Sequence, residues 1–588
     1  MASHLPSSGG SKETKRQRFE ILRAQLQQER TSFRTHWQDL GDYILPRRPR
    51  FVLSDANRGE RRNQKIIDST ATMAARTQRA GMMGGMTSPA RPWKRLTVPD
   101  PDLAEIGSVK EWLDTVNQRM DAVFLRSNLY NALPMVYGDL GVFATSAMMI
   151  EEDFKDVIRV YVFPIGSYYI STDHYGRVNV FFREFRMTVR QVVDQFAEKD
   201  SKGDLDFTRI SQHVRMMWER GQRETWIDVC HVIQPNDEWD RDRMEAKHKR
   251  YSSSYYEKGT AQSGGGYLAT NYDTYLRESG YDYFPVLCPR WETTGEDIYG
   301  TECPGMTALG DIRALQTMQK RLAQAVEKMV NPPMTAPTAL RTQKNSILPG
   351  DVTFVDVREG QQGFKPAHEV DPRVQGLMVA IQEHQARIRR AFYEDLFLML
   401  ANTDRREITA KEIEARYEEK LLALGPVLEQ LNQDLLDPLI DITFDIMVRQ
   451  GLVPEPPEEL QGVDLKVEYV SIMAQAQKLV GISTIERFSQ FAIQIAAVKP
   501  EVLDKWDGDQ TLDVYADALS LVSSIVRTDE AVAQLREARN KAQQAAQMAE
   551  RAEQVAGAAK NLSQANLDTD NALARILKQG QAGQLVPA

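Results

Sequence analysis

The stretch 304–331, PGMTALGDIRALQTMQKRLAQAVEKMVN, decides the fold that we predict for this chain. Its large apolar residues recur at steps of three or four, the period of an amphipathic α-helix. They are Met306, Leu309, Ile312, Leu315, Met318, Leu322, Val326 and Met329. The stretch 372–400 repeats the pattern with Val374, Leu377, Ile381, Ile388, Phe392 and Met399. The sequence therefore predicts two helices of 28 and 29 residues, each roughly 42–44 Å long.

Forty residues, 332–371, separate the two predicted helices. They open with NPPMTAPT and contain the strand-like DVTFVDV at 351–357. Because proline cannot continue a helix, we expect a small module at the tip of a two-helix stalk. Such a stalk has too little apolar surface to be stable alone, so neighbouring copies should flank it.

The residues before the stalk combine helices and strands. The first 14 are rich in Ser and Gly and are expected to be disordered. Helical periodicity predicts helices at 15–43, 65–83, 105–126 and 130–141, and GMMGG at 81–85 is expected to end the second. Aromatic and β-branched residues predict antiparallel strands within 157–186, 224–233 and 281–291. The intervening SSSYYEKGTAQSGGGY, 252–267, is predicted to be a flexible or hairpin insertion.

The residues after the stalk are mostly helical. A loop, ANTDRRE at 401–407, precedes a helix from 409 that continues to 450 with a kink at Gly425-Pro426. A strand at 464–470 and helices within 471–500 and 511–526 follow. Residues 529–563 have good helix propensity but only a weak apolar stripe, so this helix needs a bundle with symmetry mates. The predicted fold class is α+β and mostly helical.

Composition excludes some classes of protein. The 588 residues suggest three or four packing units. No apolar run is long enough to span a membrane, and the first residues lack the apolar region of a secretory signal. Cys230, Cys288 and Cys303 form no CxxC pair, which is typical of a reducing compartment and argues against a metal knuckle. A net charge of −9 argues against tight wrapping around nucleic acid.

Charge is unevenly spread along the chain. Residues 12–65 hold fourteen Lys/Arg against seven Asp/Glu, whereas residues 401–470 hold seven against sixteen. These segments are either solvated helical faces or charged surfaces that bind other subunits or nucleic acid.

The search for catalytic chemistry is negative. GMMGG lacks the following Lys-Ser/Thr of a phosphate loop, and its glycines follow a helix, where the dipole is negative. HExxH and GxSxG are absent, and the histidines lack metal-ligand spacing. DEWDRD at 237–242 could bind Mg²⁺ in a nuclease, or it is a solvated acidic loop. We therefore predict no catalytic residue, no cofactor and no metal site.

Three segments together resemble one protein family. They are KIIDSTATMAA with MTSPARPW (65–75 and 86–93), RWETTGEDIYG (290–300) and ITAKEIEARYEEKLLALGPVLEQLNQDLLDPLI (408–440). They resemble motifs of the portal, or head-to-tail connector, proteins of short-tailed bacteriophages, and the resemblance covers roughly 15–470. It implies a ring of twelve subunits at one capsid vertex, with a channel for DNA packaging and ejection.

The resemblance also implies a domain plan. The parts are a wing (15–303), two stem helices (304–331 and 372–400), a small α/β clip (332–371), a tunnel loop (401–407), further wing elements (408–470) and a helical crown with its tail (471–588). The implied partners are other copies of the chain, the major capsid and scaffolding proteins, the large terminase, a tail adaptor and double-stranded DNA, with no membrane. The implied location is the virion, after assembly in the host cytoplasm.

A conduit for DNA needs weak contacts, because rows of fixed cations would hold phosphates. We therefore predict that Arg405 and Arg406 in the tunnel loop face DNA, and that Lys320, Arg387 and Arg390 on the stem do so too. The alternative is that these cations pair with acids on a neighbouring subunit. In the clip, Phe354 and Phe364 are candidate anchors for subunit contacts, and Lys344 is a candidate rim charge for the motor or tail adaptor.

Two functions of other classes stay open at this point. One is a packaging-associated nuclease that uses DEWDRD and a divalent metal. The other is a tail or scaffold adaptor that binds capsid protein and has no DNA channel. A ring with a central channel would separate the portal from both.

Overall fold

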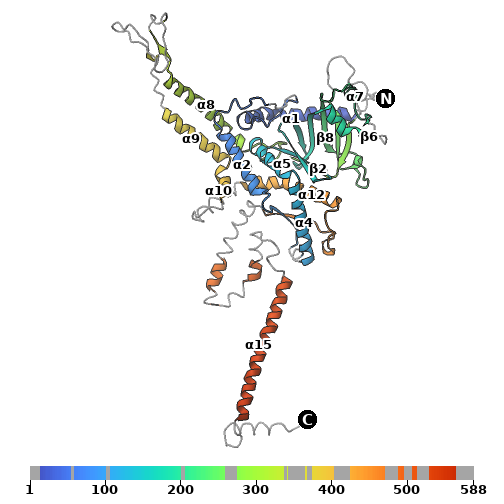
Figure 1. The fold of residues 1–588 in the computed structure, drawn as a ribbon, viewed down its shortest axis with the longest axis vertical. Helices are drawn as coiled ribbons and strands as arrows, with labels where there is room; N and C mark the ends of the chain where they lie inside the picture. Colours follow the sequence, from blue (N-terminus) through green and yellow to red (C-terminus); the bar gives the residue numbers. More distant parts are fainter. Residues whose placement is uncertain are drawn as a thin grey trace, which may run out of the picture. The chain divides into compact units, whose positions relative to one another are not determined.

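The structure is a computed structural model, and it describes residues 14–53, 59–100, 103, 106–199, 205–258, 275–336, 341, 365–366, 374–402, 424–470, 488–495, 499, 506–512 and 529–564. Its helices and strands form an α+β fold, as predicted (Figure 1). The chain divides into two units. One comprises 1–97, 113–455 and 465–503, and the other comprises 98–112, 456–464 and 504–588.

Helix α1 (Lys15–Tyr43) confirms the first predicted helix. Thr14 begins it with a capping box, in which its hydroxyl accepts from the Gln17 N–H and its own N–H donates to the Gln17 side chain. The buried face carries Phe19, Leu26 and Trp37. The Trp37 indole donates a hydrogen bond of 3.1 Å to the Phe143 carbonyl, which fixes α1 against the core.

Two antiparallel sheets form the β part of the larger unit. The five-stranded sheet has the order β10-β9-β8-β5-β4, and the three-stranded sheet has the order β11-β2-β3. Their bounds are β2 (Ala147–Asp153), β3 (Val157–Phe163), β4 (Tyr168–Thr172), β5 (Val178–Thr188), β8 (Trp226–Pro235), β9 (Tyr251–Glu257), β10 (Arg277–Tyr281) and β11 (Val286–Leu287). The predicted strand regions are confirmed by β3, β4, β5, β8 and β11, whereas β2, β9 and most of β10 lie outside them.

The structure contains further short elements. They are β1 (Lys94–Thr97), which pairs with β14 (Lys466–Tyr469), α6 (Val189–Phe196), β6 (Glu198–Lys199), which pairs with β7 (Leu205–Asp206), α7 (Gln212–Glu219) and the single turns η1 (Ala246–His248) and η4 (Glu458–Leu460). Helix α6 begins with a second capping box, between Thr188 and Gln191.

The predicted insertion at 252–267 is wrong for its first part, because Tyr251–Glu257 is strand β9. It lies between β8 and β10, which satisfy its backbone groups on both sides. Ser253 and Ser254 are buried, and the Ser253 hydroxyl lies 2.9 Å from His231 Nε2. Pairing on two sides therefore outweighs a turn-like composition. Residues 259–274 lie outside the described residues.

The glycine run forms the last turns of a helix and does not follow one. Helix α2 extends from Thr70 to Met86 and contains all of GMMGG, so it begins and ends later than predicted. A Cβ added at Gly81 would lie 2.3 Å from the Phe397 ring. Phe397 belongs to α10 (Glu394–Asn402), so the missing side chain at Gly81 allows the two helices to approach closely.

The first predicted stalk helix is confirmed and the second is interrupted. Helix α8 runs from Pro304 to Val330. In place of one helix over 372–400, the structure has α9 (Val374–Ala391) and then α10, which also takes in the first two residues of the predicted tunnel loop. The break is at Tyr393, whose φ is 54°. It directs Leu396 and Phe397 into the core, where both are buried.

The remaining described helices are α4 (Gly107–Arg126), α5 (Leu129–Phe143), residues 424–431, α12 (Asp437–Arg449), residues 488–495, residues 508–512 and α15 (Asp529–Gln564). A π-helical turn, η3 (Asn432–Leu436), joins 424–431 to α12, so the irregularity in this region falls several residues after the kink predicted at Gly425-Pro426. Helix α15 confirms the predicted 529–563. Most of the predicted helices 409–424, 471–500 and 511–526 lie outside the described residues.

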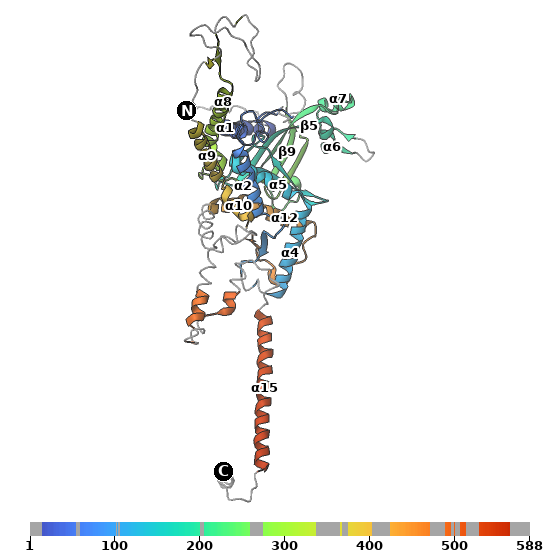
Figure 2. The same ribbon diagram turned by 60° about the vertical axis from the view of Figure 1, so that its left-hand side comes forward.

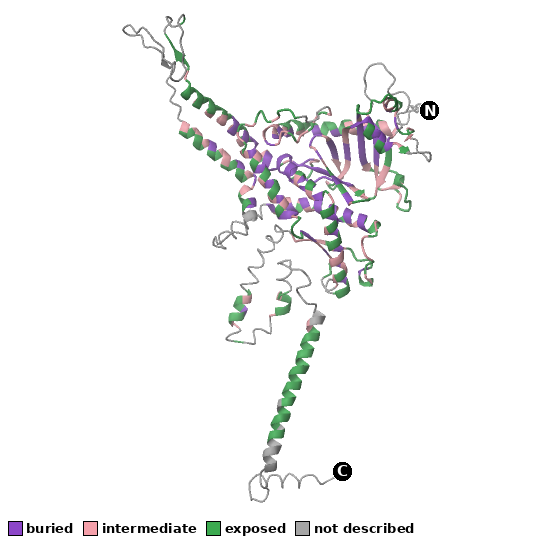
Figure 3. Cartoon of the chain, viewed as in Figure 1, coloured by how far each residue is buried: buried purple, intermediate pink, exposed green. Residues whose placement is uncertain are grey.

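The main core of the larger unit lies where α1, α2 and α5 meet the sheets and the first half of α8. It includes Trp37, Phe143, Phe181, Ile312 and Ile388. Figure 3 shows buried residues throughout this region and exposed residues along the second half of α8. Among the residues that the structure describes, no helix combines the length and the apolar character that a membrane span needs.

Candidate functional site: the two-helix stalk

Helices α8 and α9 lie side by side and run in opposite directions (Figures 1 and 2). The first half of α8 is core, because Ile312 and Leu315 are fully buried. In the second half the apolar pattern continues without cover, and Val326, Met329 and Val330 are 43%, 52% and 81% exposed. The second half of α8 therefore presents an apolar face that no described residue of the same chain covers.

A shallow groove of about 520 Å³ follows one face of the second half of α8. It is lined by Gln319, Leu322, Ala323, Val326, Glu327, Val330 and Asn331, which recur at helical spacing. Its lining combines the apolar Leu322, Ala323, Val326 and Val330 with the polar Gln319, Glu327 and Asn331. The groove has the character of a helix-packing surface, not of a small-molecule site.

The three stem cations predicted to face DNA are all exposed. Arg387 approaches Asp311 on α8 at 3.8 Å, a weak and mostly solvated pair. Lys320 and Arg390 make no ion pair within the described part of the chain. The other predicted site residues, Arg405, Arg406, Lys344, Phe354 and Phe364, lie outside the described residues, as does the strand-like 351–357.

The base of the predicted clip contains a small antiparallel pair. Strand β12 (Met334–Thr335) pairs with β13 (Lys365–Pro366), so the chain leaving α8 meets the chain returning toward α9. This pair closes the segment between the two helices at its stalk end.

An aspartate in the segment before α2 joins both stalk helices to the body. The Asp68 carboxylate accepts hydrogen bonds from Gln319 Nε2 on α8 at 3.1 Å and from Gln385 Nε2 on α9 at 2.8 Å. Its other oxygen accepts from the Thr70 N–H at 2.8 Å, at the start of α2. Gln316 completes the junction, because its amide accepts from the Asp68 N–H at 2.8 Å and donates to the Asp68 carbonyl at 2.9 Å.

This junction favours the charged form of Asp68. Burial alone would raise the pKa of the carboxyl, but the hydrogen bonds from Thr70, Gln385 and Gln319 outweigh it and lower the pKa below its ordinary value. A second contact joins the two helices directly, since His384 Nδ1 on α9 lies 2.8 Å from Asp311 Oδ1 on α8.

Sequence reasoning missed the Asp68 junction. One signal was present, because Gln316 and Gln319 share a helix face with Ile312 and Leu315. Polar residues inside an apolar stripe need partners once they are buried. The sequence gives no sign that the partner is Asp68, which lies far away along the chain.

The three resembling motifs hold the body together. Arg290 is buried and its guanidinium binds both oxygens of Asp434, at 3.2 and 3.3 Å, which ties the 290–300 motif to the 408–440 motif. In MTSPARPW, the Thr87 hydroxyl lies 2.9 Å from the Tyr137 hydroxyl, and the Trp93 indole donates to the Tyr130 hydroxyl at 3.1 Å. Their contacts are structural.

The acidic loop DEWDRD has cationic neighbours for three of its four acids. Glu238 pairs with Lys247 at 3.1 Å, Asp240 with Arg243 at 3.3 Å, and Asp237 lies 4.0 Å from Arg18. Within the described ranges, no three His, Cys, Asp or Glu side chains gather in a way that could hold a metal ion. Burial raises the pKa of the Cys230 thiol to about 12, so this cysteine is unreactive at neutral pH.

Comparisons with known proteins agree with the resemblance. Residues 16–526 match the family described as bacteriophage head to tail connecting protein. The chain is 47% identical over 572 residues to the portal protein of Salmonella phage epsilon15, covering 97% of this chain and 100% of the relative. It is 41% identical over 554 residues to the probable portal protein of Bordetella phage BPP-1, covering 94% and 96%.

Proposed function

The chain belongs to the bacteriophage head-to-tail connecting protein family, and from this premise we propose that twelve copies form a ring at one capsid vertex whose channel carries double-stranded DNA. The observation that carries the proposal is the family match over 16–526, which spans the stalk and all three motifs. The relatives are named as portal proteins, which are structural connectors and not enzymes, and this confirms the prediction of a non-enzymatic protein.

The exposed face of α8 supports assembly into a ring. Val326 and Val330 lie in the groove on this helix, and an apolar stripe of this kind is stable in water only when another surface covers it. In a closed ring each stalk has two neighbours, so every copy of the groove can be covered.

The weak pairing of the stem cations supports a conduit. Lys320, Arg387 and Arg390 have at most one distant acidic partner among the described residues, so they are available to DNA phosphates. A few such contacts attract DNA without holding it, because affinity grows with the number of neutralised phosphates.

Charge reversal in the proposed tunnel loop tests the channel. Arg405→Glu with Arg406→Glu should leave ring assembly intact but reduce DNA packaging or retention, because phosphates would meet acids at this loop. The measurement is the fraction of full heads in particles assembled with the variant. The control is Arg177→Glu with Arg241→Glu, two exposed arginines of the β part. Normal filling by the loop variant would contradict a DNA-facing role.

The proposed clip is the docking surface for the large terminase and a tail adaptor, with Phe354 and Phe364 as anchors between subunits and Lys344 at the rim. Its NPPMTAP segment favours an extended conformation, which lowers the ordering cost of docking. Capsid and scaffolding proteins would contact other parts of the ring, which assembles in the host cytoplasm and stays in the virion.

Replacing 335–366 with a short Gly/Ser linker tests this docking role. The variant rings should no longer bind the terminase or the tail adaptor, because the anchors and the rim charge are removed together. Co-sedimentation of wild-type and variant rings with each partner measures the loss. Undiminished binding of both partners would place the docking surface elsewhere.

A further inference from the structure

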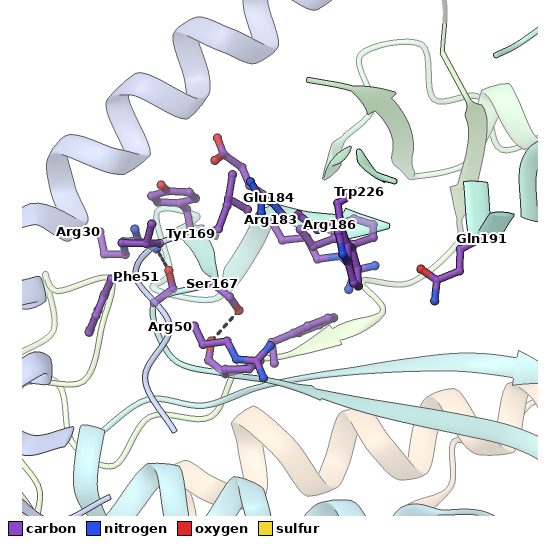
Figure 4. A pocket seen from close by; sticks show the side chains of 16 residues that line it. Arg30, Arg50, Phe51, Ser167, Tyr169, Arg183, Glu184, Arg186, Gln191 and Trp226 are labelled. Carbon is purple, nitrogen blue, oxygen red and sulfur yellow. Dashed lines mark hydrogen bonds between the residues drawn. The ribbon is translucent and has the colours of Figure 1, made fainter. Parts of the chain in front are cut away.

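A cavity of about 470 Å³ lies in the β part of the larger unit, and none of its lining residues belongs to the stalk (Figure 4). Four arginines line it. Arg30 comes from α1, Arg50 from the segment after α1, and Arg183 and Arg186 from β5. The volume falls within the range of pockets that take small ligands or single side chains of a partner.

The wall formed by residues 50–53 is fixed in place. The Arg50 N–H donates to the Ile165 carbonyl at 2.9 Å. Gly166 has a φ of 88°, and a Cβ added there would lie 2.6 Å from the Phe51 ring. The close approach of Phe51 to a bare backbone therefore sets the shape of this wall.

Arg30 is buried and Arg183 is half-buried. Arg30 is 6% exposed, and one nitrogen of its guanidinium donates to the carbonyls of Gly166 and Tyr168 at 2.5 and 2.9 Å. The Arg183 guanidinium lies 4.8 and 4.0 Å from the ring centres of Phe163 and Phe185, and its Nε is buried without a hydrogen-bond partner. Neither makes an ion pair with a described residue.

The acidic side chains near the cavity already form ion pairs with other cations or with Arg186. Arg186 pairs with Asp228 at 2.9 Å. Glu184, the acid in the lining, pairs with Lys258 at 2.7 Å and with Arg23 at 3.3 Å. Arg50 is exposed and makes no ion pair among the described residues. Arg30, Arg50 and Arg183 therefore leave an excess of positive charge around the cavity.

Glu151 is the remaining acid that acts on Arg183. It makes no ion pair with Arg183 among the described residues, and burial raises the pKa of its carboxyl. Buried cations are normally balanced by a carboxylate or another anion. An anion that balances these arginines is thus expected from outside the described part of the chain.

We propose that this cavity binds an acidic peptide segment of a partner protein, with a carboxylate at Arg50 and Arg183 and an adjacent apolar side chain against Trp226. Guanidinium groups recognise planar carboxylates through paired hydrogen bonds. Trp226 is 52% exposed although it lines the cavity, so it offers apolar area to a partner. A DNA duplex cannot enter a cavity of this volume.

The test uses ¹⁹F NMR on the assembled protein with a short probe peptide. The probe is acetyl-Asp-(4-trifluoromethyl-Phe)-Glu-amide, and its matched control carries Asn and Gln in place of Asp and Glu. Binding to a large particle broadens the fluorine line. The acidic probe should broaden and the amide probe should not. Arg50→Glu should weaken binding of the acidic probe by roughly tenfold or more.

Arg50 is suited to this test because it is exposed, so its replacement leaves the core intact. Arg50→Gln gives a second variant without charge reversal and should show a smaller loss. Arg177→Glu, an exposed arginine of the β4–β5 turn outside the cavity, should bind the probe like the wild type. Equal broadening of both probes, or undiminished binding by Arg50→Glu, would overturn the proposal. Displacement of the bound probe by deoxyadenosine monophosphate at an equal concentration would also overturn it, in favour of a nucleotide.

Discussion

Gly81 lacks a side chain at the point where Phe397 fills the adjoining space. Phe397 is 2% exposed, so its ring has little freedom to move aside. Gly84 lies one helical turn further along α2, is exposed, and would carry a Cβ with nothing within 4 Å. The two glycines therefore share a helix and differ only in what surrounds them.

This difference predicts opposite effects on stability. Gly81→Ala should lower the free energy of unfolding by about 1–3 kcal/mol, because the new methyl group forces α2 and α10 apart. Gly84→Ala should raise it by about 0.5–1 kcal/mol, because alanine loses less backbone entropy in a helix. Urea unfolding followed by circular dichroism measures both. Equal effects of the two substitutions would contradict the packing explanation.

The same residues show why sequence reasoning misplaced the end of α2. Glycine commonly ends a helix, and it also permits close contact between two helices, so GMMGG fits both. Which of the two roles the glycines have depends on Phe397, which is distant in sequence. The capping boxes at Thr14 and Thr188, by contrast, are each completed within four residues, so they depend on local sequence alone.

At the scale of elements, Asp68 connects α2, α8 and α9. Asp68→Ala removes the acceptor of Gln319 and Gln385, so both amides must find water or stay without a partner. We expect a loss of about 1 kcal/mol in the free energy of unfolding and faster hydrogen exchange in α9. Asp42→Ala is the matched control, because Asp42 forms an exposed pair with Lys65 at 2.7 Å and should matter less.

The Asp68 contribution depends on pH in a defined direction. Its pKa is lower in the folded chain than the ordinary aspartate value of 3.8. A lowered pKa means that the stabilisation is complete above the ordinary value and is lost as the pH falls through the folded value. The stability difference between wild type and Asp68→Ala should therefore be constant at neutral pH and shrink below about pH 4. A difference that does not shrink at all as the pH falls below about 4 would exclude the carboxylate as its source.

The elements differ in how well the sequence predicted them. Helix α8 was predicted to within one residue, because its apolar period is unbroken and proline is its first residue. The break at Tyr393 was missed, since Ile388, Phe392 and Met399 continue the helical spacing across it. Strand β9 was missed because serine is a poor strand signal, and its pairing with β8 and β10 is not visible in its own sequence.

At the scale of the whole molecule, two helices expose apolar side chains that another copy of the chain could cover. The second half of α8 exposes Val326, Met329 and Val330, and α15 is exposed along most of its described length. The sequence anticipated this need, because the stalk and the tail carry too little apolar surface to be stable alone. It could not give the geometry of the neighbours, which depends on surfaces from different chains.

The mass of the purified protein in solution tests the ring most directly. Twelve copies of a 66.8 kDa chain have a mass of about 802 kDa, and light scattering should find a closed particle of that size with a central hole in negative stain. Val326→Glu should weaken assembly by placing a charge in the groove, whereas Gln324→Glu, on an exposed position outside it, should not. A single species of 66.8 kDa at every concentration would contradict the account.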